Sequence, residues 1–234
     1  MTLASKIPKY DFFPPGICDY IARRGERAAH WVERYHQSGA ADMETRSSHA
    51  LQSLRTRRIA EGRCYLGQIE QTLPSLFAVE SSIGHIVSRW FYSVAAYLHY
   101  LEDDFEGAEM LLGQAERAIR CAVSQEDILL PFAHHCMDFR LQKARIARDR
   151  QQWIMMRDHL EAVQGMNENT VPLCTLTDGR EVRFPQIIDF YSSIGLSESD
   201  RNFLRSLLDT ELRLFMTKRA IRLFYTHLGP VIVY

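Results

Sequence analysis

The segment from Ser81 to Leu101 constrains the fold most, because its apolar side chains fall on nearly every face of a helix. They are Ile83, Ile86, Val87, Trp90, Phe91, Val94, Ala95, Tyr97, Leu98 and Leu101. A surface helix carries one apolar stripe, whereas a helix that is apolar all round is surrounded by other elements. The sequence therefore predicts a central helix over residues 81–101 with neighbours on several sides.

The rest of the chain also has the texture of a helical protein. Glycine and proline number only 12 and 8 among 234 residues, and they cluster at a few sites. Such sites mark breaks between elements. Apolar positions at helical spacing predict further helices over residues 17–37, 43–73, 105–123, 131–147, 151–164, 185–193 and 197–228. We expect Pro74 and Gly165 to end two of these helices, and Pro131 and Pro185 to occupy first turns.

One segment has a different pattern. Residues 171–184 alternate apolar and polar side chains around Asp178-Gly179, a pair that favours a type I′ turn. This predicts a small, exposed β-hairpin or ordered loop. The fold class is therefore all-α with one such hairpin, in a single helical domain over 1–234. It comprises a lead-in (1–16), helix pairs (17–165), the loop or hairpin (166–184), and C-terminal helices with an apolar tail (185–234).

The corner between the helices predicted over 81–101 and 105–123 carries small residues at regular spacing. Ala96, Ala108 and Ala115 stand where two antiparallel helices must approach closely, Phe105 lies at the corner, and Leu112 fills the space between the helices. Over residues 90–119 this pattern resembles a tetratricopeptide repeat (TPR).

A second unit over residues 138–163 resembles the same family less closely. Ala144, Trp153, Leu160 and Val163 match the pattern, but Met156 stands where a small residue is expected. The corner aromatics Phe105 and Trp153 lie 48 residues apart by their numbering, whereas the family repeats about every 34 residues. We predict no third unit, so the resemblance implies a TPR-like antiparallel helix-pair repeat without a regular array.

In such repeats the first helix of each pair lines a face that binds peptides or proteins. The resemblance implies the following candidates on that face: Trp90, Ser93, Tyr97 and Tyr100 from the first unit, and Asp138, Gln142, Arg145 and Arg148 from the second. Aromatic and arginine side chains are typical of interface centres. The alternative is that Trp90 and Tyr97 belong to the core and that the two arginines only face solvent.

The favoured function is a non-catalytic protein–protein interaction module, an adaptor, chaperone or inhibitor-type partner that binds another protein or a peptide. The apolar tail could also dock on a second copy, which makes a homo-oligomer possible. The first alternative is nucleic-acid binding by an arginine-rich stretch: Arg46, Arg55, Arg57, Arg58 and Arg63. A sequence pI of about 6.8 and the small number of interleaved aromatic residues argue against a dedicated nucleic-acid binder.

A helical enzyme with an unrecognised site is the second alternative, because no catalytic motif occurs. We expect no catalytic residue, metal ligand or cofactor. Glu33 and His36 form a lone ExxH, and two such pairs are needed for a di-iron bundle. His134-His135-Cys136 is expected to be packed, since adjacent helical residues point about 100° apart. The acidic corner Glu102–Asp104 is expected to stabilise the start of the next helix.

The compartment is predicted from three absences. No apolar run reaches the roughly 18 to 20 residues that span a bilayer, and the first 16 residues lack the apolar region of a signal peptide. The cysteines are few, scattered and without a CxxC pair: Cys18, Cys64, Cys121, Cys136 and Cys174. They indicate buried, reduced thiols in a cytoplasmic protein that does not enter a membrane.

Overall fold

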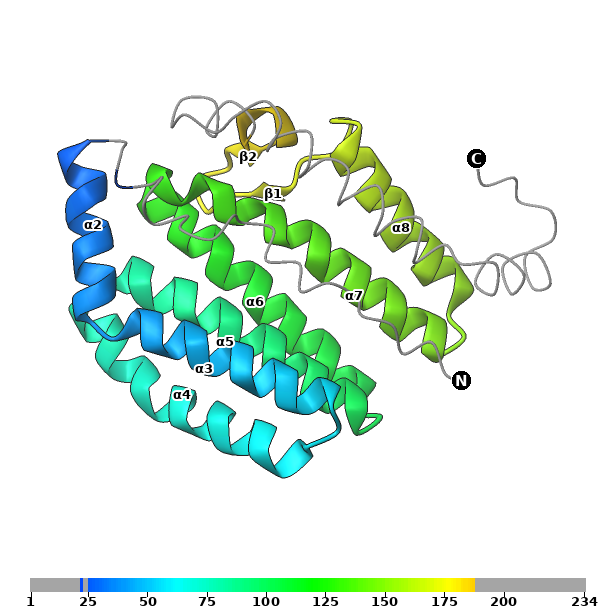
Figure 1. Ribbon diagram of the computed structural model, residues 1–234. Helices are drawn as coiled ribbons and strands as arrows, with labels where there is room; N and C mark the ends of the chain where they lie inside the picture. The colour runs from blue at the N-terminus through cyan, green and yellow to red at the C-terminus, as the bar shows by residue number, and fades with distance from the viewer. Residues whose placement is uncertain (1–21, 23–24, 188–234) are drawn as a thin grey trace.

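The computed structural model describes Ala22 and residues 25–187 (Figure 1). Several predicted segments lie outside the described residues. They are the lead-in, most of the predicted helix before Gly25, the helices predicted beyond Ile187 and the apolar tail. The elements in chain order are α2 (Glu26–Gln37), α3 (Ala40–Arg55), α4 (Ile59–Val79), α5 (Ser81–Leu101), α6 (Phe105–Gln125), the 3₁₀ helix η1 (Asp127–His134), α7 (His135–Asp149), α8 (Trp153–Asn167), β1 (Cys174–Thr175) and β2 (Glu181–Val182).

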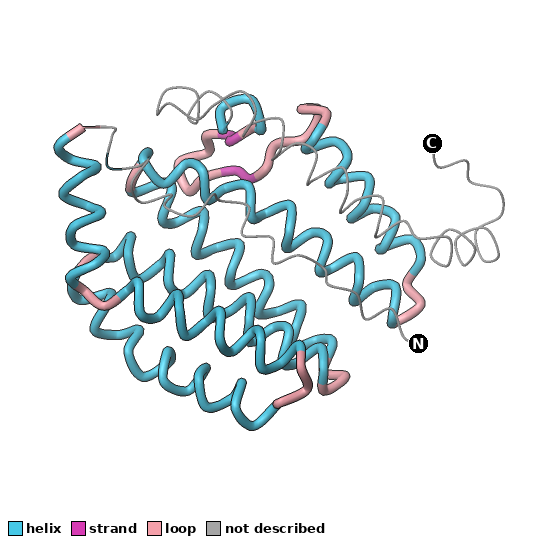
Figure 2. Tube along the Cα trace, viewed as in Figure 1, coloured by secondary structure: helices cyan, strands magenta, loops and turns pink. Residues whose placement is uncertain are grey.

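The prediction of an all-α fold with one small hairpin is confirmed. Helices dominate the described chain, and the two short strands form a single antiparallel pair (Figure 2). The predicted central helix over residues 81–101 is α5, with the same bounds. It packs against α3, α4 and α6, which explains why it is apolar on several faces. In the described part of the chain, no helix is long and apolar enough to cross a membrane.

Three consecutive helix pairs, α3–α4, α5–α6 and α7–α8, turn through the same kind of corner. Arg57, Asp103 and Gln151 have positive φ angles of 62°, 61° and 60°. The next residue donates its N–H to a carbonyl five residues earlier, at 2.8, 3.0 and 2.7 Å for Arg58, Asp104 and Gln152. This 6→1 bond with a left-handed residue before it is the Schellman motif. The described chain therefore repeats one corner at intervals of 46 and 48 residues.

Side chains repeat with the corners. An alanine stands seven residues before each left-handed residue, at Ala50, Ala96 and Ala144, and all three are buried. A buried leucine stands nine residues after each left-handed residue: Leu66, Leu112 and Leu160. The α3–α4 pair is thus a third unit, which the sequence analysis missed.

The residue five positions after the left-handed residue is buried in each pair: Gly62, Ala108 and Met156. A Cβ on Gly62 would lie 2.6 Å from a methyl carbon of Leu54, so the first pair admits only glycine there without rearrangement. Ala96, Ala108 and Ala115 are 2%, 0% and 0% exposed, which confirms their predicted burial. Met156 is fully buried as well, so the third pair accommodates a long side chain at that position.

The prediction of one helix over residues 43–73 is wrong, because this segment belongs to two helices, α3 and α4, which begin earlier and end later than predicted. The chain turns at Thr56–Arg58, where Arg57 supplies the left-handed conformation that glycine usually provides. Pro74 does not end a helix but lies inside α4 on its exposed side. Proline removes one helical N–H, and at an exposed site water can satisfy the freed carbonyl of Glu70.

Other predicted boundaries also shift. Gly25, with φ of 115°, interrupts the helix predicted over residues 17–37. Pro131 lies within η1, and α7 begins only at His135, because proline inside the apolar run favours short 3₁₀ turns over a continuous α-helix. Gly165 lies inside α8, which ends only at Asn167, and the left-handed residue after this helix is Asn169. The start of the helix predicted from Pro185 is present at residues 184–187, and the rest of that predicted helix lies outside the described residues.

The hairpin exists, but its turn and exposure differ from the prediction. Gly179 has φ of 85°, while Asp178 does not have a positive φ, so the turn is not type I′. The bonds Gly179 N–H to Leu176 O (3.1 Å) and Leu176 N–H to Arg180 O (2.8 Å) define a three-residue loop with glycine in the left-handed position. Leu173, Cys174 and Val182 are buried, so the hairpin packs on the helical core.

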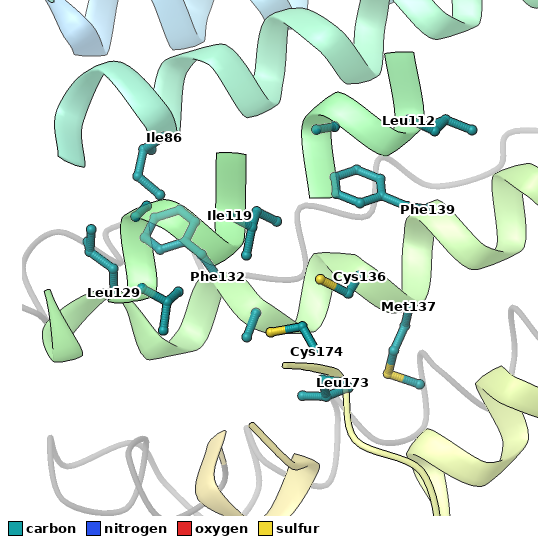
Figure 3. Close-up of a cluster of buried hydrophobic side chains, with 14 of the residues drawn as sticks. Ile86, Leu112, Ile119, Leu129, Phe132, Cys136, Met137, Phe139, Leu173 and Cys174 are labelled. Atoms are coloured by element: carbon teal, nitrogen blue, oxygen red, sulfur yellow. The ribbon is translucent and has the colours of Figure 1, made fainter. Parts of the chain in front are cut away.

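Figure 3 shows that contact from inside the core. Leu173 and Cys174 of the hairpin lie beside Cys136 and Met137 of α7, and all four are buried. The prediction of buried cysteines holds for Cys136 and Cys174, whereas Cys64 is exposed on α4 and Cys121 is half-buried. Cys18 lies outside the described residues.

Candidate functional site

A groove of about 200 Å³ crosses the first helices of the three pairs. Its lining comes mainly from α5, with further residues from α3 and α7 and one residue from α6. The lining residues are Leu51 and Arg55 from α3, then Trp90, Ser93, Val94, Ala96, Tyr97 and Tyr100 from α5, then Leu112 from α6, and Gln142, Arg145 and Ile146 from α7. We call this set the central groove.

The repeat places equivalent residues around the central groove. Leu51, Tyr97 and Arg145 each stand six residues before the left-handed residue of their corner. All three line the groove, one from each first helix. The groove is therefore a consequence of stacking three similar units, and its chemistry changes from leucine through tyrosine to arginine across equivalent positions.

Aromatic rings form the middle of the groove. The rings of Tyr97 and Tyr100 stack with centroids 6.1 Å apart and planes 20° apart. The Trp90 ring lies against the Arg89 guanidinium, with 3.2 Å from its carbon to the ring centroid, and meets the His135 ring edge-on at 5.6 Å. Trp90, Tyr97 and Tyr100 are half-buried. Trp90 and Tyr97 therefore line the wall of the groove and are not fully buried core residues.

The structure brings together most of the candidates inferred from the sequence. Trp90, Ser93, Tyr97, Tyr100, Gln142 and Arg145 all line the central groove.

Two candidates on α7 lie outside it. Asp138 is partly buried, and its carboxylate lies 3.2 Å from Nδ1 of His135. Arg148 donates from Nε to Asp149 at 2.7 Å. On α7, Arg145 and Ile146 stand three and four residues after Gln142, so these three groove residues lie on one side of the helix. Asp138 and Arg148 lie before and after this run and contact their own neighbours.

Tyr100 joins the groove to α7. Its hydroxyl donates a hydrogen bond to the carboxylate of Asp149. Burial, reinforced by the hydrogen bond and negative charge of Asp149, raises the pKa of Tyr100 to about 12. At neutral pH Tyr100 is therefore a neutral donor that fixes the α5–α7 contact and holds the floor of the groove in one orientation.

The charged residues that line the groove are both arginines, Arg55 and Arg145. The nearest acidic residues of the α5–α6 and α7–α8 corners already have partners. Glu102 forms an ion pair with Arg63, and Asp149 bonds both Tyr100 and Arg148. Among the described residues, the lining of the groove therefore combines apolar and aromatic side chains with two arginines.

The acidic corner behaves as expected. The side chain of Asp104 accepts a hydrogen bond from the Gly107 N–H at 3.0 Å and caps the start of α6. Its other carboxylate oxygen lies 2.6 Å from Nδ1 of His99. The His99 contact, with the cap bond, lowers the pKa of Asp104. Asp104 therefore has a role in capping the helix.

The histidine pair beside the groove is buried, as predicted. The rings of His134 and His135 stack with centroids 5.5 Å apart, and each residue is 3% exposed. Burial lowers the pKa of His134 to about 3 and lowers the pKa of His135 well below its usual value, with the charge of Arg89 acting in the same direction. Both rings are neutral under ordinary conditions. Within residues 25–187, no cluster of three or more His, Cys, Asp or Glu side chains is placed to hold a metal ion.

The arginines proposed for nucleic-acid binding have different local surroundings. Arg46 bonds Gln68, Arg58 pairs with Glu61 at 2.6 Å, and Arg63 pairs with Glu102. Only Arg55 belongs to the groove, and Arg57 forms the first corner.

Sequence reasoning missed the contribution of α3 to the central groove. The sequence assigned Leu51 only to the apolar side of the helix predicted over residues 43–73 and Arg55 to the nucleic-acid alternative, because the break at Arg57 carries no glycine or proline. The signal that could have found them is the repeated spacing from Ala50 to Leu66, which matches that from Ala96 to Leu112.

Comparisons of this chain with protein-family models, with curated proteins and with solved structures give no match.

Proposed function

We propose that this chain is a non-catalytic, TPR-like interaction module that binds a segment of another protein in the central groove. The observation that carries the proposal is the convergence of the three first helices on one groove lined by tyrosine, tryptophan and arginine. These residue types dominate the energetic centres of protein interfaces.

The size of the groove supports a peptide as the occupant. Small-molecule and cofactor sites usually have volumes of about 300 to 1,000 Å³, whereas this groove has about 200 Å³. It therefore suits one or two side chains of an extended segment better than a whole cofactor. The stacked helix pairs give the segment a rigid surface, because each pair is buried against its neighbour.

Ser93 offers a direct test, because it is small and lies in the groove between Trp90 and Tyr97. A Ser93→Trp variant should fill the groove without removing a core side chain. Met110→Trp is the control, since Met110 is 58% exposed on α6 and does not line the groove. Both variants should give the circular dichroism of the unaltered protein.

The measurement is affinity capture from the cells that produce the protein, followed by quantitative mass spectrometry. We expect proteins retained by the unaltered chain and by Met110→Trp to be lost with Ser93→Trp. Equal retention by all three would contradict binding in the groove.

A further inference from the structure

We propose that Cys136 and Cys174 are a redox-sensitive pair, in which hydrogen peroxide oxidises the two thiols to a disulfide that ties the hairpin to α7. This inference is independent of the central groove and assigns a modification site to the chain. It is carried by the position of the two side chains, which lie beside each other in the core although they are 38 positions apart in the sequence (Figure 3).

Two elements bring the sulfurs together. Cys136 lies in the first turn of α7 and is 1% exposed, whereas Cys174 lies on β1 and is 6% exposed. Both are free thiols, and the Cys136 thiol donates a hydrogen bond to the sulfur of Cys174. Cysteines whose side chains point apart cannot be bridged without backbone movement. The hydrogen bond shows that these two sulfurs already face each other.

The hairpin holds Cys174 in this position. The Leu173 N–H donates to the Val182 carbonyl at 2.7 Å, which pairs β1 with β2. At the loop, the Thr177 N–H donates to Oγ of Ser124 on α6 at 3.1 Å. The strand that carries Cys174 is thus fixed both to its partner strand and to the helical core.

The two thiols are not equivalent. The hydrogen bond from Cys136, aided by the charge of Arg120 and opposed by burial, lowers the pKa of the Cys174 thiol. The same hydrogen bond, together with burial, raises the pKa of the Cys136 thiol well above its usual value. The thiolate is the reactive form of cysteine. Cys174 is therefore the thiol that meets the oxidant, and Cys136 is the thiol that resolves the product.

Hydrogen peroxide balances the reaction in two steps. The Cys174 thiolate attacks one peroxide oxygen, so that an S–O bond forms, the O–O bond breaks, and the leaving hydroxide takes up the proton that the Cys174 thiol released. The Cys136 sulfur then attacks the sulfur of this sulfenic acid. The S–S bond forms, the S–O bond breaks, and the second hydroxide leaves as water with the Cys136 proton. The two sulfurs lose two electrons, and the peroxide oxygens gain them in two waters.

The disulfide closes a loop that contains the whole of α8. A cross-link of this kind stabilises a fold mainly by reducing the conformational freedom of the unfolded chain. For a loop of about 40 residues, the melting temperature should rise by roughly 10 °C on oxidation.

The experiment maps the cross-link in the full chain. The reduced protein is treated with hydrogen peroxide, the remaining thiols are blocked with N-ethylmaleimide in urea, and the digest is analysed by mass spectrometry without reduction. We expect the peptides of Cys136 and Cys174 to appear as one species that dithiothreitol separates. Protein oxidised in urea is the comparison, because the unfolded chain no longer selects the partner and should link other cysteines as well.

Three variants separate the roles of the thiols. Cys136→Ser should leave Cys174 as a sulfenic acid that dimedone labels, whereas Cys174→Ser should show no dimedone label at Cys136. Neither variant should gain melting temperature on oxidation. Cys64→Ser is the matched control, since Cys64 is exposed on α4, and it should leave the cross-link unaltered.

Other outcomes would overturn the proposal at identifiable steps. If Cys136 and Cys174 both remain open to N-ethylmaleimide in peroxide-treated protein while Cys64 is oxidised, the pair is not redox-sensitive. A cross-link that forms equally well in native protein and in urea would show that the fold does not bring the pair together. Dimedone labelling of Cys136 instead of Cys174 would reverse the order of attack. An unchanged melting temperature in cross-linked protein would remove the disulfide as a tie between the hairpin and α7.

Discussion

Tyr100 shows how a single residue links the groove to the helix stack. Its ring packs on Tyr97 and lies 6.0 Å from the Phe105 ring, while its hydroxyl bonds Asp149 beyond the groove. The sequence could predict that Tyr100 lies on the first-helix face, because helical spacing relates it to Tyr97. It could not predict the bond to Asp149, which depends on how α5 and α7 pack together although the two residues are 49 positions apart in the sequence.

The raised pKa of Tyr100 leads to a prediction at alkaline pH. The folded-state pKa of Tyr100 lies near 12, above the usual 10.0. Its contribution to the free energy of unfolding is therefore complete below pH 10 and is lost as the pH rises towards 12. Tyrosinate absorbance should therefore show one tyrosine that ionises near pH 12 and disappears in Tyr100→Phe. A difference spectrum between the two proteins centred near pH 10 would contradict the Asp149 contact.

The buried pair His134 and His135 gives a prediction at acidic pH. For His134 the folded-state pKa of about 3 lies below the usual 6.5, so its contribution to stability is complete above pH 6.5 and is lost as pH falls towards 3. Urea midpoints should fall through this range, and His134→Gln should reduce the slope. His36→Gln, at an exposed position, is the control. An equal slope in all three proteins would show that His134 is not buried.

The corners show why part of the element structure was not predictable from the sequence. Helix ends are usually recognised from glycine or proline, but the three Schellman corners use arginine, aspartate and glutamine in the left-handed conformation. The second corner could be predicted because aspartates surround it and Phe105 follows. The first could not, since Thr56-Arg57-Arg58 looks like part of a helix.

The same corners predict a stabilising substitution. A left-handed conformation costs a residue with a Cβ roughly 1 to 2 kcal/mol, and glycine avoids this cost while losing some entropy on folding. Arg57→Gly and Gln151→Gly should each raise the free energy of unfolding by up to about 1 kcal/mol in urea titrations. Arg57→Val should lower it. A loss of stability with glycine at both positions would contradict the corner geometry.

Two glycines of α4, Gly62 and Gly67, allow a controlled test of how tightly α3 and α4 pack. At Gly62 a new Cβ would lie 2.6 Å from Leu54, whereas at Gly67 nothing lies within 4 Å. Gly62→Ala should destabilise by about 1 to 3 kcal/mol through overpacking, less the gain in helix propensity. Gly67→Ala should stabilise by up to about 1 kcal/mol from propensity alone. Equal effects in urea titrations would show that the pair is not tightly packed.

At the scale of the whole molecule, the groove depends on all three helix pairs. The sequence could predict the α5 wall and part of the α7 wall, because small residues, corner aromatics and leucines recur there in register. It could not predict the α3 wall, because the turn between α3 and α4 contains no glycine or proline that would mark it in the sequence. The position of Arg55 beside Arg145 in one groove arises only from the stacking of the units.

The three tryptophans of the chain allow the most direct test of groove binding. Trp90 lines the groove, Trp31 is buried and donates to Ser82 at 2.8 Å, and Trp153 follows the α7–α8 corner. The measurement is a titration of ¹⁵N-labelled protein with a peptide from a protein that the unaltered chain retains and Ser93→Trp does not, observed at the indole N–H resonances. We predict that the Trp90 resonance shifts and saturates while those of Trp31 and Trp153 stay in place. Saturable peptide binding that leaves the Trp90 resonance unmoved would contradict the central claim.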